Sequence, residues 1–141
     1  MRRLPKWLAP SLIAALLGGA AMAQSDQFRT MPDPAELSSW RWENRLLFVI
    51  GGGQDDAAFD DQIERLRADP SGLRNRDLIV FTDPEGRSAL SREFDAEGFA
   101  VVLVGKDGGV KRRETAPLAL DSLYSTIDAM PMRRREMRED G

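Results

Sequence analysis

The chain has 141 residues, of which 42% are hydrophobic and 30% charged, a composition that fits one globular domain with a short appendage. It contains no cysteine and no histidine, which excludes thiol catalysis, disulfides and histidine-ligated metal sites. The net charge is −3, and it becomes −6 if Arg2, Arg3 and Lys6 are removed with an N-terminal leader. Such a protein has no general electrostatic attraction to nucleic acid or to anionic lipid.

The first 23 residues have the pattern of a secretory signal peptide. Basic residues open the segment, an apolar run covers residues 8–20, and an Ala-Met-Ala cleavage pattern ends at Ala23. We therefore expect cleavage after Ala23 and a periplasmic or secreted protein. The alternative is an uncleaved membrane anchor, but the apolar run is short for a span of about 20 residues, so we expect no membrane span in the mature chain.

Residues 24–39 form a polar leader segment, which we expect to be ordered only where it docks on the domain. Within it, Asp33 is placed to cap a short helical turn that begins at Pro34. Trp40 and Trp42 follow two positions apart, so on an extended chain they share one face. We expect both to pack this segment onto the domain, and the alternative is a platform on which a ligand stacks.

The apolar run Arg45–Ile50 predicts a strand that is buried on both faces. A helix is expected over about 56–68, with Phe59, Ile63 and Leu66 on its apolar face. In many α/β proteins the turn that follows the first strand carries the chemistry. Here that turn holds no Cys, Ser, His or Lys, and it consists of Gly51, Gly52, Gly53, Gln54, Asp55 and Asp56.

Two more apolar runs, residues 77–82 and 99–104, predict further buried strands, and Leu90 and Phe94, four apart, predict a short helix between them. The Asp-Gly pair within residues 105–109 predicts a tight hairpin.

The hairpin leads into the charged segment Val110–Glu114, which is expected at the sheet edge. A last helix is expected over 117–129, with its core face formed by Leu120, Leu123, Tyr124 and Ile127. Pro131 is expected to stop this helix and to leave residues 132–141 as a charged tail.

This order of elements predicts an α/β thioredoxin-like three-layer sandwich over residues 40–131. A right-handed parallel βαβ unit is followed by a hairpin and a C-terminal helix. The result is a mixed four-stranded sheet with helices on both faces.

Three stretches of the chain resemble the DUF4174 family, namely residues 42–49, 75–78 and 127–134, and residues 102–110 resemble the strand–Asp-Gly–strand hairpin of peroxiredoxin-like proteins. The resemblance covers about Trp40 to Arg135. It implies a small exported bacterial protein with a thioredoxin-like fold, related to domains of animal extracellular-matrix proteins, and it implies no established reaction. The glycine turn stands where redox thioredoxins carry a reactive cysteine, and the segment Gly98-Phe99-Ala100 lacks their cis-proline.

Three charged groups allow alternative functions. The aspartates near the glycine turn could hold a divalent cation, although they lack the spacing of an EF-hand loop and are also placed to cap the helix. An arginine–aspartate pair at the starts of the two central strands is expected to tie the strand ends together. The basic residues form either a basic patch or a solvated edge and tail, and they are Lys106, Lys111, Arg112, Arg113, Arg133, Arg134 and Arg135.

The sequence therefore predicts an exported, non-catalytic thioredoxin-like binding or scaffold domain without a cofactor. Its expected partner is a periplasmic or extracellular protein, and nucleic acid is not expected. The alternative is a divalent-metal-assisted or cofactor-independent enzyme that uses the acidic turn. The candidate binding surface consists of Trp42, Asn44, Gly51, Gly52, Gly53, Gln54, Asp55, Asp56, Lys106 and Asp107.

Overall fold

The computed structural model describes residues 27–141, so the predicted signal peptide and the predicted cleavage after Ala23 lie outside the described residues. Five strands form one sheet in the order β1-β3-β2-β4-β5. β1, β3 and β2 are parallel to one another. β4 pairs antiparallel with β2, and β5 pairs antiparallel with β4. The strands are β1 (Phe28–Thr30), β2 (Arg45–Ile50), β3 (Leu78–Asp83), β4 (Ala100–Val104) and β5 (Val110–Glu114).

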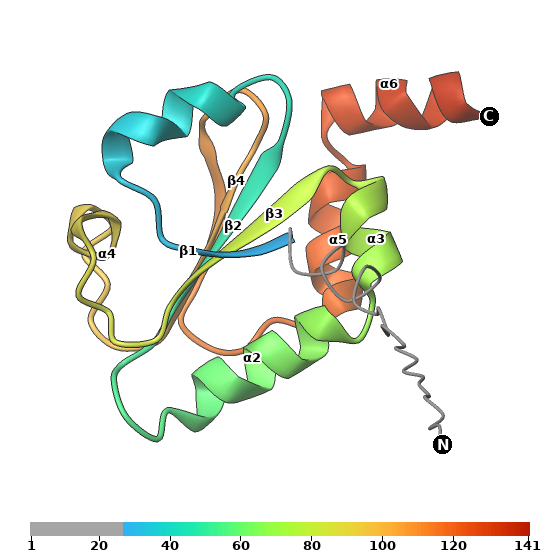
Figure 1. Cartoon of the computed structure of the whole chain (residues 1–141). Coiled ribbons are helices and arrows are strands. Elements are labelled where there is room, and N and C mark those ends of the chain that lie inside the picture. The colour runs from blue at the N-terminus through green and yellow to red at the C-terminus, as the bar shows by residue number, and fades with distance from the viewer. Residues whose placement is uncertain (1–26) are drawn as a thin grey trace, which may run out of the picture.

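The sheet is covered on both faces, as the continuous apolar strands predict (Figure 1). Successive side chains of β2 point to opposite faces. Leu47 and Val49 pack on the face covered by α2 (Ala57–Arg67), α3 (Pro70–Asn75) and α5 (Leu120–Asp128). Leu46 and Phe48 pack on the other face, with the 3-10 helix η2 (Pro34–Trp40) and α4 (Ala89–Glu93). The predicted α/β three-layer architecture is confirmed.

The polar leader contains a strand that was not predicted. Phe28 lies opposite Val80 in β3, so β1 becomes one edge of the sheet and raises the number of strands from four to five. The helical turn at Pro34 is confirmed, because the Asp33 side chain accepts from the Ala35 N–H at 3.0 Å. β5 lies at the other edge, as its charge predicts.

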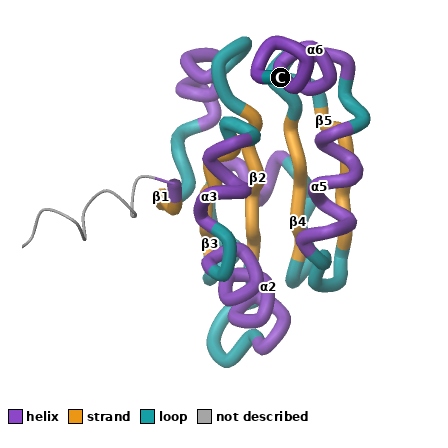
Figure 2. The backbone as a smooth tube through the Cα atoms, turned by 90° about the vertical axis from the view of Figure 1, so that its right-hand side faces the viewer, coloured by secondary structure: helices purple, strands orange, loops and turns teal. Residues whose placement is uncertain are grey.

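The last predicted helix ends before Pro131, as expected, but Pro131 also begins a new helix, and Pro70 begins another. Pro70 opens α3, where the Asp69 side chain accepts from the Gly72 N–H, and Pro131 opens α6 (Pro131–Asp140). Proline suits the first helical position because its missing N–H has no intrahelical partner there. The predicted charged tail is therefore a helix that lies across one end of the sheet, while α2 extends toward the other end (Figure 2).

The prediction that Trp40 and Trp42 share one face is wrong. Trp40 packs edge-on against Phe81, with 5.1 Å between the ring centroids. Trp42 is 61% exposed, and its backbone is left-handed with φ +73° rather than extended.

No helix among residues 27–141 is long and apolar enough to cross a membrane.

Candidate functional site

The ten residues of the predicted binding surface do not lie together. The glycine turn, residues 51–56, follows the carboxyl end of β2, whereas Trp42, Asn44, Lys106 and Asp107 lie at its amino end. The Trp42 N–H donates to the Lys106 carbonyl at 2.6 Å, which joins the chain before β2 to the β4–β5 hairpin. A six-residue strand spans roughly 17 to 20 Å, so these are two separate surfaces at opposite ends of the sheet.

The glycine turn is closed by hydrogen bonds of its own. The Gly51 N–H donates to the Asp83 carbonyl at 2.8 Å and the Gly53 N–H to the Pro84 carbonyl at 3.1 Å. A Cβ on Gly51 would collide with the Pro84 carbonyl oxygen, so the close approach of this turn to the end of β3 requires glycine. The turn therefore joins the ends of two strands.

The acidic residues of this turn mainly stabilise the start of α2. The Asp56 carboxylate accepts from the N–H groups of Gly52, Ala58 and Phe59 at 2.7, 3.0 and 3.1 Å. Asp61 pairs with Arg65 one turn along the helix at 3.0 Å. Throughout residues 27–141, no group of three or more acidic side chains gathers where it could hold a metal ion. The geometry thus gives no support to the metal-assisted alternative.

A buried Asp–Ser–Ser chain lies beyond the same end of the sheet. Asp83 accepts from the Ser91 hydroxyl at 2.6 Å, and the Ser88 hydroxyl donates to that of Ser91 at 2.9 Å. Burial alone would raise the pKa of Asp83, but hydrogen bonds from Ser91 and Ser88 hold that pKa below its ordinary value. The chain has no histidine to take a proton from either hydroxyl, so these contacts fix α4.

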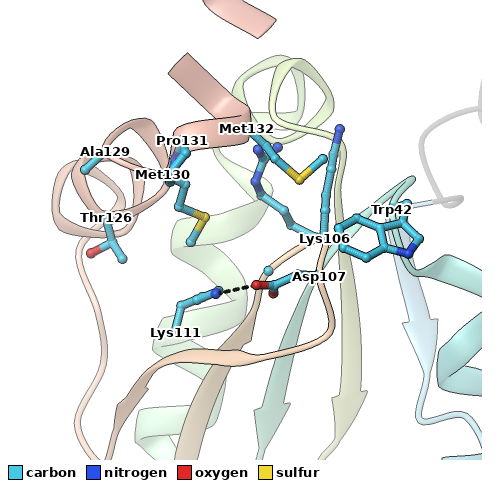
Figure 3. Close-up of a pocket in the computed structure, with 11 residues that line it drawn as sticks. Trp42, Lys106, Asp107, Lys111, Thr126, Ala129, Met130, Pro131 and Met132 are labelled. Carbon is cyan, nitrogen blue, oxygen red and sulfur yellow. Dashed lines mark hydrogen bonds and ion pairs between the residues drawn. The ribbon is translucent and has the colours of Figure 1, made fainter. Parts of the chain in front are cut away.

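A pocket of about 560 Å³ opens at the opposite end, between the hairpin and the junction of α5 with α6 (Figure 3). Trp42 lies at one side of it and Met130 and Met132 at the other. A bulky residue in the left-handed region is strained, and such strain is concentrated at functional sites. The lining residues are Trp42, Arg45, Gly105, Lys106, Asp107, Lys111, Thr126, Ala129, Met130, Pro131 and Met132.

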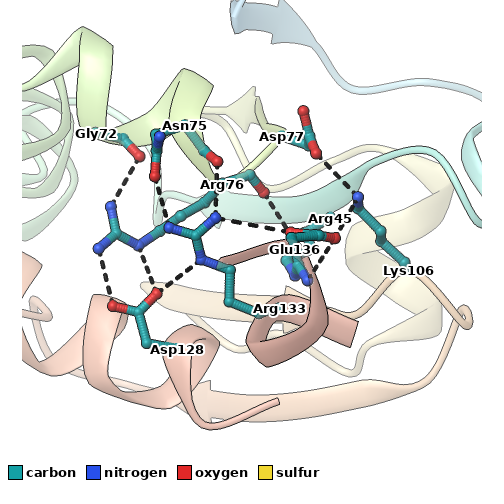
Figure 4. A network of polar contacts seen from close by, with 9 residues as sticks. All are labelled: Arg45, Gly72, Asn75, Arg76, Asp77, Lys106, Asp128, Arg133 and Glu136. Atoms are coloured by element: carbon teal, nitrogen blue, oxygen red, sulfur yellow. Dashed lines mark hydrogen bonds and ion pairs between the residues drawn. The ribbon is translucent and has the colours of Figure 1, made fainter. Parts of the chain in front are cut away.

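A network of ion pairs lies beside the pocket and fixes α6 to the strand ends (Figure 4). Glu136 of α6 accepts from both terminal nitrogens of Arg45 at 3.2 Å and from Lys106 at 2.7 Å. Lys106 also contacts Asp77 at 2.9 Å. Burial alone would raise the pKa of Glu136, but hydrogen bonds from Lys106 and Arg45 hold that pKa below its ordinary value.

A second carboxylate completes the network. Asp128 at the end of α5 pairs with Arg76 at 2.9 Å and with Arg133 at 3.0 Å. Burial would raise its pKa as well, and the hydrogen bonds from these two arginines lower it below the ordinary value.

The strand ends are tied together, as the sequence predicts, but by backbone acceptors. Arg45 donates to the Arg76 carbonyl at 2.9 Å, and Asn44 donates to the Asp77 carbonyl at 3.2 Å. The carboxylates that neutralise these arginines come from α5 and α6, which the sequence analysis did not bring to this end. The three-residue spacing of Arg133 and Glu136 would have indicated a helical pair, had the segment not been interpreted as a tail.

The predicted basic residues do not form one patch. Lys106 and Arg133 are buried in the network, Lys111 pairs with Asp107 at 2.8 Å, and Arg112 pairs with Glu114 at 2.8 Å. Arg134 and Arg135 are exposed to solvent on α6, in agreement with the expected alternative of a solvated edge and tail.

Comparison with solved structures shows the fold. A crystal structure of reduced 2-Cys peroxiredoxin from Plasmodium vivax superimposes with a TM-score of 0.58, over 70% of this chain and 84% of that one, at 11% sequence identity. Human ERp44 in a zinc-bound form gives a TM-score of 0.45 over 86% of this chain and 36% of that one, at 15% identity. The architecture is thioredoxin-like, and without cysteine the chain cannot carry out the thiol chemistry of redox thioredoxins.

Sequence comparison extends this result to the family. Coiled-coil domain-containing protein 80 of Danio rerio is 27% identical over 133 residues, which is 72% of this chain. The chain spans about 15% of the length of that curated relative. The family profile described as "Domain of unknown function (DUF4174)" matches residues 36–136, most of the part that the structure describes. The chain therefore belongs to the DUF4174 family, as the resemblance of its strand and helix ends predicts.

Proposed function

We propose that this protein is an exported, non-catalytic binding domain that meets a periplasmic or extracellular protein through the end of the sheet that carries Trp42. The surface that redox thioredoxin-like proteins use for chemistry is here a closed glycine turn without a thiol. A binding role accounts for the exposed tryptophan and the pocket at the other end, neither of which the fold requires.

Trp42 is the observation that carries the proposal. Its side chain contributes little to the core because it is 61% exposed, yet its backbone is held in a strained conformation beside a pocket. Tryptophan is enriched among the residues that dominate binding energies, because it offers a large rigid surface with one hydrogen-bond donor. The pocket volume of about 560 Å³ falls in the range of ligand sites, roughly 300 to 1,000 Å³.

Export is supported by the sequence pattern of residues 1–23. The chain expressed with its own N-terminus should be recovered outside the cytoplasm and should begin at Gln24, as determined by the intact mass of the mature protein. Recovery of the full 141-residue chain from the membrane fraction would favour the uncleaved anchor instead.

Site-directed photo-crosslinking tests the binding role. A photoreactive phenylalanine analogue is placed at Trp42 in one strain and at Gln54, exposed on the glycine turn, in the matched strain. We expect a discrete crosslinked product only from position 42, and we expect excess unlabelled wild-type protein to suppress it while excess Trp42→Ala protein does not. Equal products from both positions, or a product that wild-type protein fails to suppress, would contradict the proposal.

A further inference from the structure

The charges beside the pocket do not balance. Four cationic side chains, Arg45, Arg76, Lys106 and Arg133, share three carboxylates, Asp77, Asp128 and Glu136. Of the three carboxylates, Asp77 lies nearest the solvent, with about half of its side chain exposed. Counted by these ion pairs, the group carries a net charge of +1, and the Asp69 carboxylate, which also acts on Arg76, reduces this excess at the Arg76 end.

One hydrogen-bond donor in this group lacks an acceptor. Arg45 is 1% exposed and forms part of the pocket wall. Its two terminal nitrogens are bonded, but its Nε is the one buried side-chain nitrogen or oxygen in residues 27–141 without a partner. A buried unsatisfied donor costs on the order of 1 to 3 kcal/mol, and more when the group is charged. The nitrogen itself is covered, so an acceptor from the pocket would remove this cost once the side chains over Arg45 move aside.

The rest of the pocket is apolar and adaptable. Met130, Met132, Ala129 and Pro131 come from the junction of α5 and α6, and Trp42 closes the opposite side. Methionine side chains rotate readily about three bonds, so this wall can adjust around a ligand that reaches Arg45. The exposed charges on the hairpin, Asp107 and Lys111, neutralise each other at 2.8 Å and leave the balance at +1.

We propose that the pocket binds a small organic acid with an apolar body, of the chemistry of a medium-chain carboxylic acid. The carboxylate accepts from Arg45 Nε, and the apolar body lies between Trp42 and the two methionines. An alkyl amine would meet a site that is already positive, a neutral apolar molecule would leave the buried donor unpaired, and a bare inorganic anion would leave the apolar wall unused. This assignment rests on the proposed function, because it places a ligand at the same end of the sheet.

Titration with sodium octanoate tests the assignment, with octan-1-ol and octylamine as probes of the same chain length. Binding is followed by tryptophan fluorescence, and the Arg45 Nε–H resonance is followed in the ¹⁵N-labelled protein and identified by its loss in Arg45→Lys. We expect octanoate to bind about ten-fold more tightly than either control and to move the Arg45 resonance downfield, because a charged acceptor forms the stronger hydrogen bond. Arg45→Lys should remove the advantage of octanoate over octan-1-ol.

Two outcomes would overturn the assignment. One is equal affinity for octanoate and octan-1-ol, which would show that the ligands bind through apolar contacts alone. The other is a saturated fluorescence change with an unmoved Arg45 resonance, which would show that water satisfies the donor. The comparison of octanoate with octan-1-ol on the wild-type protein needs no substitution, so it can overturn the assignment even if Arg45→Lys folds poorly. Failure of octanoate with crosslinking at Trp42 intact would reject the ligand class alone, and the reverse result would reject the protein-binding role alone.

Discussion

Buried polar side chains hold segments together that are far apart in the sequence. Gln62 of α2 is 1% exposed, and its amide pairs with both backbone groups of Leu118, accepting from the N–H at 2.6 Å and donating to the carbonyl at 3.1 Å. It thereby supplies both hydrogen-bond partners of the Leu118 backbone, in the segment that leads into α5, as a neighbouring strand would. The helical periodicity of α2 places Gln62 next to Ile63 on the inner face, but no sequence pattern identifies its partner.

Gln62→Met should lower the free energy of unfolding by about 2 to 4 kcal/mol, because it leaves a buried N–H and a buried carbonyl without partners while nearly preserving side-chain volume. Urea denaturation measures the effect. Glu64→Ala, at an exposed position of the same helix, is the control and should change stability by less than about 0.5 kcal/mol. A loss below about 1 kcal/mol for Gln62→Met would mean that water replaces both hydrogen bonds.

Trp42 illustrates a conflict between stability and the proposed binding function within one residue. Its φ of +73° suits glycine, and its exposed side chain contributes little burial. Trp42→Gly should therefore raise the free energy of unfolding by about 1 kcal/mol through relief of strain. Chemical denaturation measures this gain. Trp42→Val provides the matched opposite, since a β-branched residue is worse in this region, and it should be less stable than the wild type. A stability ranking of Val above Gly would contradict the strain argument.

At the scale of elements, α6 is held mainly by charge. Arg133 is its one buried residue, and the helix reaches the rest of the protein through Arg133 and Glu136. A helix docked in this way should depend on pH in a manner that an apolar helix does not. Since the folded pKa of Glu136 lies below its ordinary value of 4.5, its contribution is complete above that value and is lost as the pH falls through the folded pKa.

Glu136→Gln should cost about 2 kcal/mol of stability at pH 7, because it leaves Arg45 and Lys106 with a neutral partner. The difference between the variant and the wild type should shrink as the pH falls from 4.5 through the lower folded pKa, where the carboxyl of the folded wild type becomes protonated. Urea denaturation at a series of pH values measures it. Glu139→Gln, exposed on the same helix, should show no such trend. A difference that is independent of pH would mean that packing of the side chain, not its charge, holds α6.

The elements that sequence analysis predicts are those whose signal is local. β2 was predicted over Arg45–Ile50 and β5 over Val110–Glu114, the bounds that the structure shows, because apolar runs and a glycine hairpin leave few alternatives. β1 has three residues and exists through its pairing with β3, which no local pattern encodes. α6 has no apolar face to detect, since its partners are charges contributed by other segments.

The residues of the candidate site likewise include some that the sequence predicts and some that it does not. Trp42, Lys106 and Asp107 belonged to the predicted binding surface, and all three line the pocket. The sequence could not show that Met130 and Met132 lie opposite Trp42, because that depends on how α6 docks. The sequence also could not show that the glycine turn and Lys106 lie at different ends of the sheet. Each follows a central strand, and they are separated only because β4 runs antiparallel to β2.

At the scale of the whole molecule, the sheet separates a closed end from an open one. The glycine turn lies in close contact with the end of β3, whereas the opposite end has an exposed tryptophan, a pocket and an unpaired donor. Substitutions at the two ends should therefore affect stability and binding independently.

Gly51→Ala and Trp42→Gly should give opposite results in two measurements. Gly51→Ala should lose about 2 kcal/mol of stability, because the added Cβ meets the Pro84 carbonyl, yet it should bind octanoate with wild-type affinity under conditions where it is folded. Trp42→Gly should be more stable and should lose the octanoate-dependent fluorescence change and the shift of the Arg45 resonance. Gly52→Ala, whose added Cβ would lie 3.3 Å from the Asp56 carboxylate and would not overlap a backbone carbonyl, is the control for the turn and should be milder in stability and unchanged in binding. Denaturation and titration of the same three proteins make this comparison, and a folded Gly51→Ala protein with weakened octanoate binding would show that the two ends are coupled through the sheet.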